Sequence, residues 1–246
     1  MGTADLHTHT SLSDGMMDVG ALLEHVQEQT SLDVLAVTDH DDIAAGILAQ
    51  ELVRERGYRF QVVIGAEITT LEGHLLGLFL QHKVAPFQSL AATLKAIHLQ
   101  SGLAIVPHPM SWLTFSVGQR SIDRVMNANK AGVYLDGIEI ENPTIAGKLT
   151  REKVQRLNRE RYHLAVVGGS DAHFLAAVGS GYARFPGHTA DELRQAILEK
   201  QTEAISTEID LKRIGYGALV KQQVRSLVVQ PTRAVSRPLL KFLRGT

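Results

Sequence analysis

Short runs of β-branched and other apolar residues alternate along this chain with amphipathic segments of helical length. Strands are expected at residues 5–7, 34–39, 61–67, 74–80, 103–108, 137–142 and 164–171. Helices are expected at residues 18–29, 43–56, 87–100, 121–130 and 150–161. Strands that alternate with helices form a mostly parallel sheet, which is either open and doubly wound or closed into a barrel. The pattern alone leaves both arrangements open.

The composition is that of a compact protein with one main domain. The chain has 246 residues, of which 44% are hydrophobic and 21% are charged, and this length suits one α/β domain with a small appendage. The absence of cysteine excludes disulfides, thiol catalysis and metal sites built on cysteine. No apolar run reaches the roughly 18 residues of a membrane span, and the N-terminus lacks a basic-then-apolar signal. We therefore expect a cytoplasmic protein without stable membrane insertion.

The two ends of the chain differ in charge. Residues 211–246 contain eight Lys and Arg residues and no acidic residue, so their net charge is +8. Because the whole chain has a net charge of −1, residues 1–210 have a net charge of −9. We expect residues 1–210 to form the main domain. Residues 211–246 are expected to form a basic C-terminal extension that is helical and packs on the acidic main domain. An amphipathic segment that contacts anionic lipid or nucleic acid is the alternative.

Histidine and acidic side chains gather near the ends of the expected strands. His7 and His9 are two residues apart after the first strand, and Asp171 and His173 have the same spacing after the last. Because alternate residues of an extended chain face the same side, each pair can present two ligands to one metal ion. The carboxyl ends of parallel strands are also the edge at which α/β folds place their active sites. The nine candidate metal ligands are His7, His9, Asp14, His40, Glu67, His74, His108, Asp171 and His173.

This mixture of imidazole and carboxylate ligands favours the hydrolysis of a phosphate ester. Two cations about 3.5–4 Å apart can share a water, lower its pKa and present hydroxide in line with phosphorus. A third cation can neutralise the phosphate oxygens and the charge that develops on the leaving group. The chain has neither a Gly-rich phosphate loop nor a Gly-x-Ser-x-Gly motif, so the sequence gives no support to nucleotide-driven or serine-hydrolase chemistry.

Five short segments in order resemble the motif set of the PHP (polymerase and histidinol phosphatase) superfamily. They are Asp-Leu-His-Thr-His at 5–9, Thr-Asp-His-Asp at 38–41, Gly-Ala-Glu at 65–67, His-Pro at 108–109 and Ser-Asp-Ala-His at 170–173. The resemblance extends over residues 4–205. It implies a distorted (β/α)7 barrel that holds two or three divalent metal ions, which would be zinc, manganese or iron.

The same resemblance implies a role for each ligand. One ion would be held by His7, His9, Glu67 and Asp171. Glu67 would bridge to a second ion, which is also held by His74 and His108, and Asp14, His40 and His173 would hold a third. Glu67 and Asp171 would be the catalytic residues, in the sense that they position the metal-bound hydroxide.

The segment Ser13-Asp14-Gly15 is similar to the branch that contains nucleotide phosphoesterases and 5′ exonucleases. The histidinol-phosphatase branch usually has histidine at the position of Asp14. Members of the nucleotide branch tend to carry a sizeable insertion between the positions of His74 and His108. Only 33 residues separate these two here, which is enough for one helix and one strand.

The leading functional hypothesis is a metal-dependent phosphoesterase that hydrolyses a phosphate monoester of a small metabolite or nucleotide. One alternative is a 5′-to-3′ exonuclease or nucleoside 3′,5′-bisphosphatase, which would act on a nucleic-acid or nucleotide end. The other is a non-catalytic regulatory module that metals stabilise. Arg120 and Arg184 are candidates for binding the substrate phosphate, since a guanidinium can contact it with two hydrogen bonds. Trp112 and Phe115 are expected in a loop that overhangs the site.

Overall fold

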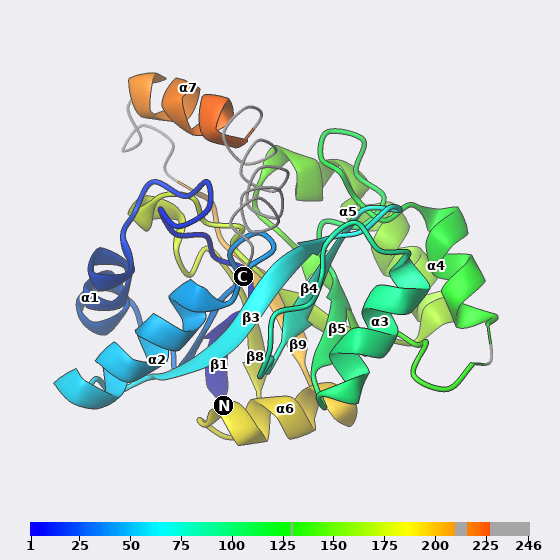
Figure 1. Ribbon diagram of the computed structural model, residues 1–246, viewed down its shortest axis with the longest axis horizontal. Helices are drawn as coiled ribbons and strands as arrows, with labels where there is room; N and C mark the ends of the chain where they lie inside the picture. The colour runs from blue at the N-terminus through cyan, green and yellow to red at the C-terminus, as the bar shows by residue number, and fades with distance from the viewer. Residues whose placement is uncertain (129, 210–215, 227–246) are drawn as a thin grey trace, which may run out of the picture.

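The computed structural model describes residues 1–128, 130–209 and 216–226, and this part of the chain contains nine strands and seven α-helices (Figure 1). The strands are β1 (Gly2–Asp5), β2 (Val34–Val37), β3 (Gln61–Thr69), β4 (His74–Leu78), β5 (Leu103–Val106), β6 (Gly137–Glu141), β7 (Ala165–Gly168), β8 (Gly181–Phe185) and β9 (Glu203–Ser206). The helices are α1 (Val19–Gln29), α2 (Ala44–Arg56), α3 (Leu90–Leu99), α4 (Gln119–Met126), α5 (Ile145–Leu157), α6 (Ala190–Leu198) and α7 (Tyr216–Val224).

The strands form one sheet with the order β7-β6-β5-β4-β3-β2-β1-β8-β9. Strands β1, β2 and β3 are mutually parallel, as are β5, β6 and β7, whereas β4 runs antiparallel to both of its neighbours. Strand β8 is antiparallel to both β1 and β9. The sequence predicts seven strands in a distorted (β/α)7 barrel. The structure adds β8 and β9, and both β4 and β8 run antiparallel to their neighbours.

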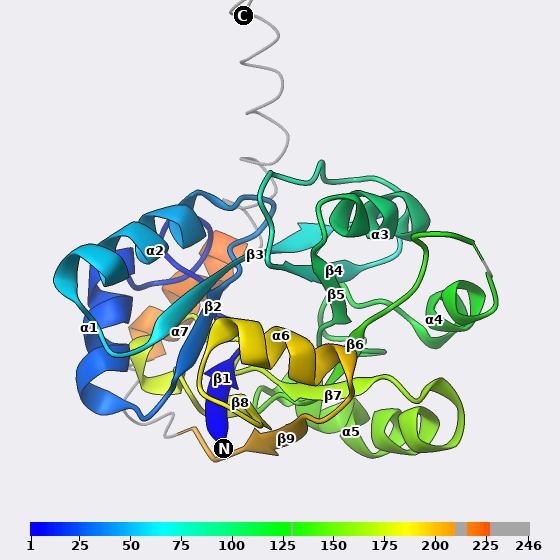
Figure 2. The same cartoon turned by 90° about the horizontal axis from the view of Figure 1, so that it is seen from below.

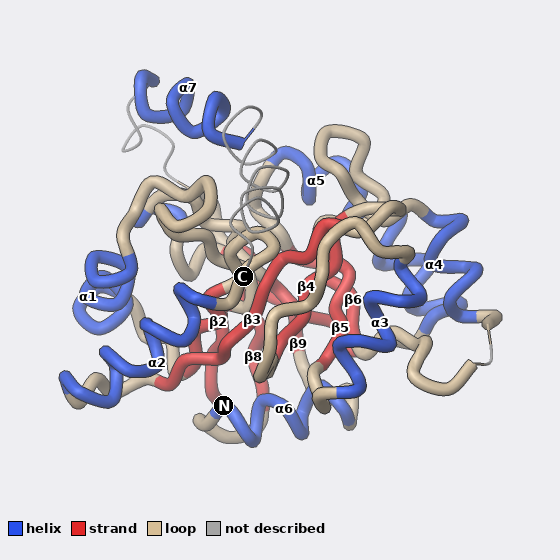
Figure 3. Tube along the Cα trace, viewed as in Figure 1, coloured by secondary structure: helices blue, strands red, loops and turns tan. Residues whose placement is uncertain are grey.

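The sheet curls into a nearly closed barrel because its two ends approach each other (Figure 3). A Cβ added at Gly168 on β7 would lie 2.4 Å from the carbonyl oxygen of Tyr182 on β8, so only glycine allows this approach of the backbones. On the other side of the gap, Thr202 donates a 2.6 Å hydrogen bond to the carbonyl oxygen of Val166. Strands at the two ends of the sheet do not pair with each other. Close backbone packing and a side-chain hydrogen bond close the α/β barrel there instead.

Helix α6 covers the end of the barrel at which the parallel strands begin (Figure 2). Its side chains Leu193, Ala196 and Ile197 are fully or nearly fully buried with the residues inside the barrel. Its first residue also hydrogen-bonds the side chain of Gln61, the first residue of β3. The loops that carry the candidate ligands lie at the opposite end, where the parallel strands finish.

The other helices cover the outside of the sheet. Helices α1 and α2 lie on one side, and α3, α4 and α5 lie on the other (Figure 1). The helix expected at 150–161 begins earlier, at Ile145, because the Thr144 hydroxyl caps its first turn. It also gives way to a π-helical turn at Asn158–Tyr162.

Helix α7 is the described part of the expected basic extension, and it lies at the ligand-bearing end of the barrel (Figure 1). Residues 211–215 and 227–246 of that expected extension, and residue 210 of the expected main domain, lie outside the described residues. None of the described helices is long and apolar enough to cross a membrane.

One histidine outside the candidate ligand set joins α3 to the segment between α4 and β6. His98 in α3 lies 3.0 Å from the carbonyl oxygen of Gly132 through Nδ1 and 2.9 Å from Asp136 through Nε2. Its ring stacks on Tyr134 at 3.9 Å. Burial acts against a charged ring, but these hydrogen bonds raise the pKa of His98 above its ordinary value of 6.5.

A raised pKa in the folded state means that His98 stabilises the fold most below pH 6.5, and that this contribution is lost as the pH rises through the higher pKa. We therefore expect His98→Gln to remove a part of the free energy of unfolding that declines with rising pH. Denaturant unfolding of both proteins across this range measures the effect. His82→Gln, which alters an exposed histidine, is the control. An identical pH slope in wild type and His98→Gln would contradict the prediction.

Candidate metal centre

The nine candidate ligands converge at the carboxyl-terminal end of the barrel. His7 and His9 follow β1, Asp14 lies in the next loop, and His40 follows β2. Glu67 is in β3, His74 begins β4, His108 follows β5, and Asp171 and His173 follow β7. Between His7 and His9, Thr8 turns to the opposite side and donates a 2.7 Å hydrogen bond to Ala36 of β2. The alternation of the extended chain therefore directs both imidazoles into the site, as the sequence predicts.

The first group of ligands consists of His7, His9, Glu67 and Asp171. His7 Nε2 lies 3.5 Å from both Glu67 Oε2 and Asp171 Oδ1. His9 Nε2 lies 3.3 Å from Glu67 Oε2 and 3.4 Å from Asp171 Oδ1. Ligands bonded at about 2.1 Å to a tetrahedral ion are separated by about 3.4 Å. The four nitrogen–oxygen separations are thus those expected between ligands of one ion, and His7, His9 and Glu67 form one of the compact ligand groups of the cluster.

The second group uses the other oxygen of the same carboxylate. Glu67 Oε1 lies 2.9 Å from His74 Nδ1 and 3.0 Å from His108 Nε2. Glu67 is 2% exposed, so water does not surround either oxygen. One set of imidazole nitrogens therefore lies beside Oε1 of this carboxylate, and another set lies beside Oε2.

The third group surrounds Asp14. Asp14 Oδ2 lies 3.2 Å from His173 Nε2 and 3.7 Å from His40 Nε2. His40 Nδ1 also lies 3.4 Å from Glu67 Oε2, so this ring stands between Asp14 and Glu67. The His9 ring stacks on those of His40 and His173 with centroid separations of 4.8 and 4.4 Å. The structure thus brings Asp14, His40 and His173 together, with His9 beside them.

Three of the histidines are oriented by a hydrogen bond at Nδ1. His173 Nδ1 donates to the carbonyl oxygen of Asp171 at 2.9 Å. The other two pair Nδ1 with a side chain: His7 with Glu139 at 3.1 Å, and His108 with Ser116 at 2.7 Å. Such bonds fix the ring and leave Nε2 directed at the cluster, which is the usual arrangement of metal-binding histidines.

Glu139 is a buried residue of this centre that the sequence analysis does not identify. Besides His7, its carboxylate accepts hydrogen bonds from the backbone N–H of His108 at 2.7 Å and from Asn142 at 2.8 Å. A Cβ at Gly169 would lie 2.3 Å from Glu139 Oε1, so glycine is needed there. A signal was present in the sequence, because Glu139 is an acidic residue in the middle of the strand expected at 137–142.

We expect Glu139→Gln to weaken metal binding by about 10–100-fold, since loss of a group that orients a ligand typically costs this much. The neutral amide keeps the size of the side chain but removes the charge that faces His7. Equilibrium dialysis with Mn²⁺ measures the change. Glu141→Gln is the matched control, because Glu141 lies on the same strand but pairs with Arg151 and Ser206 instead. Equal affinities for the two variants would contradict an orienting role.

The electrostatics of the cluster keep its carboxylates ionised. Burial acts against the charged form of Glu67, but the surrounding imidazoles of His74, His40 and His7 hold its pKa well below the ordinary value of 4.5. Burial also opposes the charged form of His173, yet the carboxylate of Asp14 raises the pKa of His173 to about 9. Burial lowers the pKa of His40 to about 4, so this ring is neutral at pH 7 with a free nitrogen lone pair.

The donor set fits divalent metal ions. Within the described residues, His7 Nε2, both ring nitrogens of His9, and His40 Nδ1 are buried without a hydrogen-bond partner. Buried polar atoms normally have partners, and these four atoms all face carboxylates of the cluster. Groups of three or four ligand atoms lie within 4.8 Å of one another throughout the cluster. A bound cation would satisfy the nitrogens and balance the buried negative charge.

The acidic residues flanking His40 organise loops around the cluster. Asp39 accepts hydrogen bonds from the backbone and side chain of Thr10 and from Ser13, and so holds the loop that carries Asp14. Asp41 accepts from the backbone and side chain of Thr69 beside Glu67.

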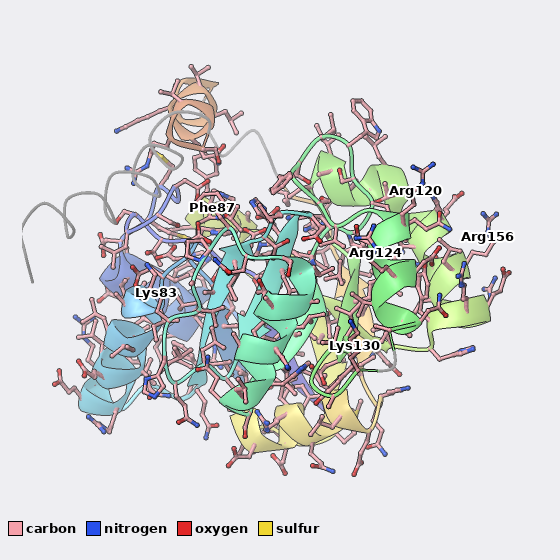
Figure 4. All side chains as sticks on the ribbon, turned by 45° about the vertical axis from the view of Figure 1, so that its right-hand side comes forward. Lys83, Phe87, Arg120, Arg124, Lys130 and Arg156 are labelled. Atoms are coloured by element: carbon pink, nitrogen blue, oxygen red, sulfur yellow. The ribbon has the colours of Figure 1, made fainter. Side chains whose placement is uncertain are left out.

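The structure does not bring Arg184 to the cluster. Because β8 runs antiparallel to β1, Arg184 pairs with Thr3 and lies toward the opposite end of the barrel, where it forms a 3.4 Å ion pair with Glu203. Arg120 lies at the start of α4, exposed and directed outward (Figure 4). Neither position places a guanidinium among the candidate ligands.

The loop after His108 does reach the cluster. The Phe115 ring lies edge-on to His74 at 5.6 Å, and the Phe115 carbonyl oxygen accepts a 2.8 Å hydrogen bond from the backbone N–H of His74. Trp112 in the same loop is 76% exposed. Phe115 therefore places one aromatic ring of this loop against a candidate ligand.

Comparisons with known proteins agree with this fold. The family model described as PHP-associated matches residues 153–202. A two-domain protein from Bacteroides vulgatus that contains a predicted PHP-like metal-dependent phosphoesterase superposes with a TM-score of 0.66 at 17% identity. That superposition covers 83% of this chain and 64% of the other.

Two relatives are similar in sequence. The uncharacterized protein MJ1587 of Methanocaldococcus jannaschii is 35% identical over 150 residues, which is 56% of this chain and 81% of MJ1587. The 5′-3′ exoribonuclease Rnm of Escherichia coli is 38% identical over 78 residues, which is 30% of this chain and 26% of Rnm.

The barrel and its end-on cluster of histidines and carboxylates define a protein with the fold of the PHP-like metal-dependent phosphoesterases. Within that class, the chain belongs to the same family as MJ1587.

Proposed function

We propose that this protein is a metal-dependent phosphoesterase that hydrolyses a phosphate monoester of a small metabolite or nucleotide. The observation that carries the proposal is the buried carboxylate of Glu67, whose Oε1 faces His74 and His108 while Oε2 faces His7, His9 and His40. A carboxylate placed in this way can bridge two ions. The likeness to PHP-like phosphoesterases in fold supports the same reading.

The residues present would hold three ions. The first group is His7, His9, Glu67 and Asp171, the second is Glu67, His74 and His108, and the third is Asp14, His40 and His173. When bound, divalent ions supply Lewis-acid chemistry and an activated water for attack on phosphorus. Zinc, manganese and iron all suit mixed imidazole and carboxylate ligands, and the carboxylate of Asp14 favours a hard ion in the third group.

The protein's own residues fix where the reaction takes place. Glu67 Oε2 and Asp171 Oδ1 each lie 3.3–3.5 Å from the His7 and His9 nitrogens, so these residues would hold an ion that positions the reacting water. His173 holds a proton in the metal-free site, since Asp14 raises its pKa to about 9. Phe115 places an aromatic ring against His74 on one side of the site.

The surroundings of the site favour a small substrate. The 33 residues between His74 and His108 form β4, a loop, α3 and β5, and all of them are described. That stretch contains no inserted domain that could enclose a nucleotide base. We therefore expect the protein to recognise its substrate through the phosphate and the leaving group next to it.

The second candidate is a 5′-to-3′ exonuclease, and the observation that favours it is the 78-residue similarity to the exoribonuclease Rnm. The Ser13-Asp14-Gly15 segment supports the same branch. A nucleic-acid end would then enter past the exposed Trp112.

A direct assay tests both candidates. Purified protein is loaded with Mn²⁺, Zn²⁺ or Fe²⁺ and given an aryl phosphate, a panel of phosphorylated metabolites, mononucleotides and a 5′-phosphorylated oligonucleotide. We expect metal-dependent release of phosphate from small monoesters. Stepwise shortening of the oligonucleotide without release from small monoesters would favour the exonuclease. Absence of any hydrolysis by protein with verified metal content would contradict both and leave a regulatory module.

A further inference from the structure

The end of α7 reaches back to the loop that carries Asp14. Arg225 Nη2 donates hydrogen bonds to the carbonyl oxygens of Ser11 at 2.8 Å and Ser13 at 3.1 Å. The hydroxyl of Ser226 donates to Asp14 Oδ2. These contacts join residues more than two hundred positions apart, and α7 lies over this loop in Figure 1.

The Asp14 loop is therefore held from two sides. On the inner side, Asp39 accepts hydrogen bonds from Thr10 and Ser13. On the outer side, Arg225 binds the backbone carbonyls of the same turn.

Ser226 is itself oriented by a neighbour. Gln222, one helical turn earlier and 7% exposed, donates its side-chain N–H to the Ser226 oxygen at 3.3 Å. Because a hydroxyl has one proton and Gln222 approaches its oxygen, that proton is directed at Asp14. The result is a chain of hydrogen bonds from Gln222 through Ser226 to a carboxylate that also contacts His173 and His40.

We propose that the C-terminal segment 216–226 completes the Asp14 metal pocket, with Ser226 and Arg225 as positioning residues that hold Asp14 for the third ion. A carboxylate has about four lone-pair sites, so one hydrogen bond from Ser226 fixes its rotation and leaves sites for a cation. Ligating carboxylates are commonly held by such outer hydrogen bonds. The inference rests on the proposed function only in assigning Asp14 to an ion, and it gives part of the basic extension a role in the site.

Metal binding by the full-length chain tests this role without an activity assay. Metal-depleted wild type, Ser226→Ala, Arg225→Ala and Asp14→Ala are titrated with Mn²⁺ in equilibrium dialysis. We expect three ions in the wild type and loss of one in Asp14→Ala. Ser226→Ala and Arg225→Ala should weaken that same ion by about 10–100-fold and leave the other two unchanged.

Two further variants serve as controls, one for the loss of charge and one for the loss of the hydroxyl. Lys221→Ala removes the same charge as Arg225→Ala from an exposed position of the same helix, and should bind Mn²⁺ as the wild type does. Ser226→Thr keeps the hydroxyl and should retain most of the affinity. If Arg225→Ala and Lys221→Ala had equal effects, long-range charge would explain the result and the positioning role of Arg225 would be overturned.

Other outcomes overturn the proposal directly. Unchanged Mn²⁺ binding in Ser226→Ala would do so, and tighter binding would show that the hydroxyl competes with the ion. Uptake of only two ions by the wild type would also overturn it. A wild type that binds three ions in a Ser226-dependent way but hydrolyses nothing would contradict the proposed function while leaving this inference intact.

Discussion

Glu67→Ala should abolish phosphoesterase turnover and reduce bound metal by more than one ion per chain. Each oxygen of this carboxylate faces a different set of imidazoles at 2.9–3.5 Å, so its removal takes a ligand from two groups at once. It also removes the main carboxylate that raises the pKa of His74 against the effect of burial, whereas His7 keeps Asp171 and Glu139, which raise its pKa more than Glu67 does.

Elemental analysis of the purified variant and hydrolysis of an aryl phosphate at saturating metal measure the two effects. Glu203→Ala is a suitable control, because Glu203 lies on β9 and pairs with Arg184 away from the cluster. It should keep full activity and metal content. A Glu67→Ala protein with full metal content and normal activity would show that no carboxylate bridge exists.

The candidate ligands could be found from the sequence because each lies at or beside a strand end. The spacing of His7 and His9 is enough to place both rings on one side once β1 is recognised, and the structure shows Thr8 turned the other way. The edge of the sheet then brings together residues from β3, from β4, and from the segments that follow β1, β2, β5 and β7. The roles assigned to individual ligands remain predictions for metal analysis.

The elements that the sequence analysis misses are short or depend on distant partners. Strands β8 and β9 have only five and four residues, and each is defined by antiparallel pairing. Helix α6 did carry a local signal, since Thr189 and Glu192 form a capping box at its start. Its role in covering the barrel depends on tertiary packing that spacing does not show.

The same limit explains the missed site residues. Glu139 acts through His7, which is 132 positions away, and Ser226 acts through Asp14 across most of the chain. Neither residue lies at the end of an expected strand. Arg184 was a candidate because it follows His173 closely, but the turn into an antiparallel strand carries it away from the site. Proximity in sequence fails where the chain reverses direction.

Removal of the metal ions should lower the melting temperature substantially. Three carboxylates and six imidazoles are packed together, and several of the nitrogens have no hydrogen-bond partner in the described part of the chain. Ions that bind only the native state stabilise it by mass action, by about 2.7 kcal/mol for each ion present at a hundred times its dissociation constant. For a chain of this length, 1 kcal/mol corresponds to a shift of roughly 2–4 °C. Each ion should therefore contribute about 5–10 °C under those conditions.

The measurement compares the melting temperature of metal-loaded protein, of protein stripped by a chelator with verified metal loss, and of stripped protein given Mn²⁺ again. We expect a fall on stripping and recovery on reloading. Glu67→Ala serves as the internal reference, because a variant that has already lost more than one ion should respond much less to the chelator. A wild-type melting temperature that is unchanged after verified metal removal would mean that the ions, if bound, do not favour the folded state. The clustered side chains would then have to be stabilised by imidazolium–carboxylate pairs alone, such as His173 with Asp14.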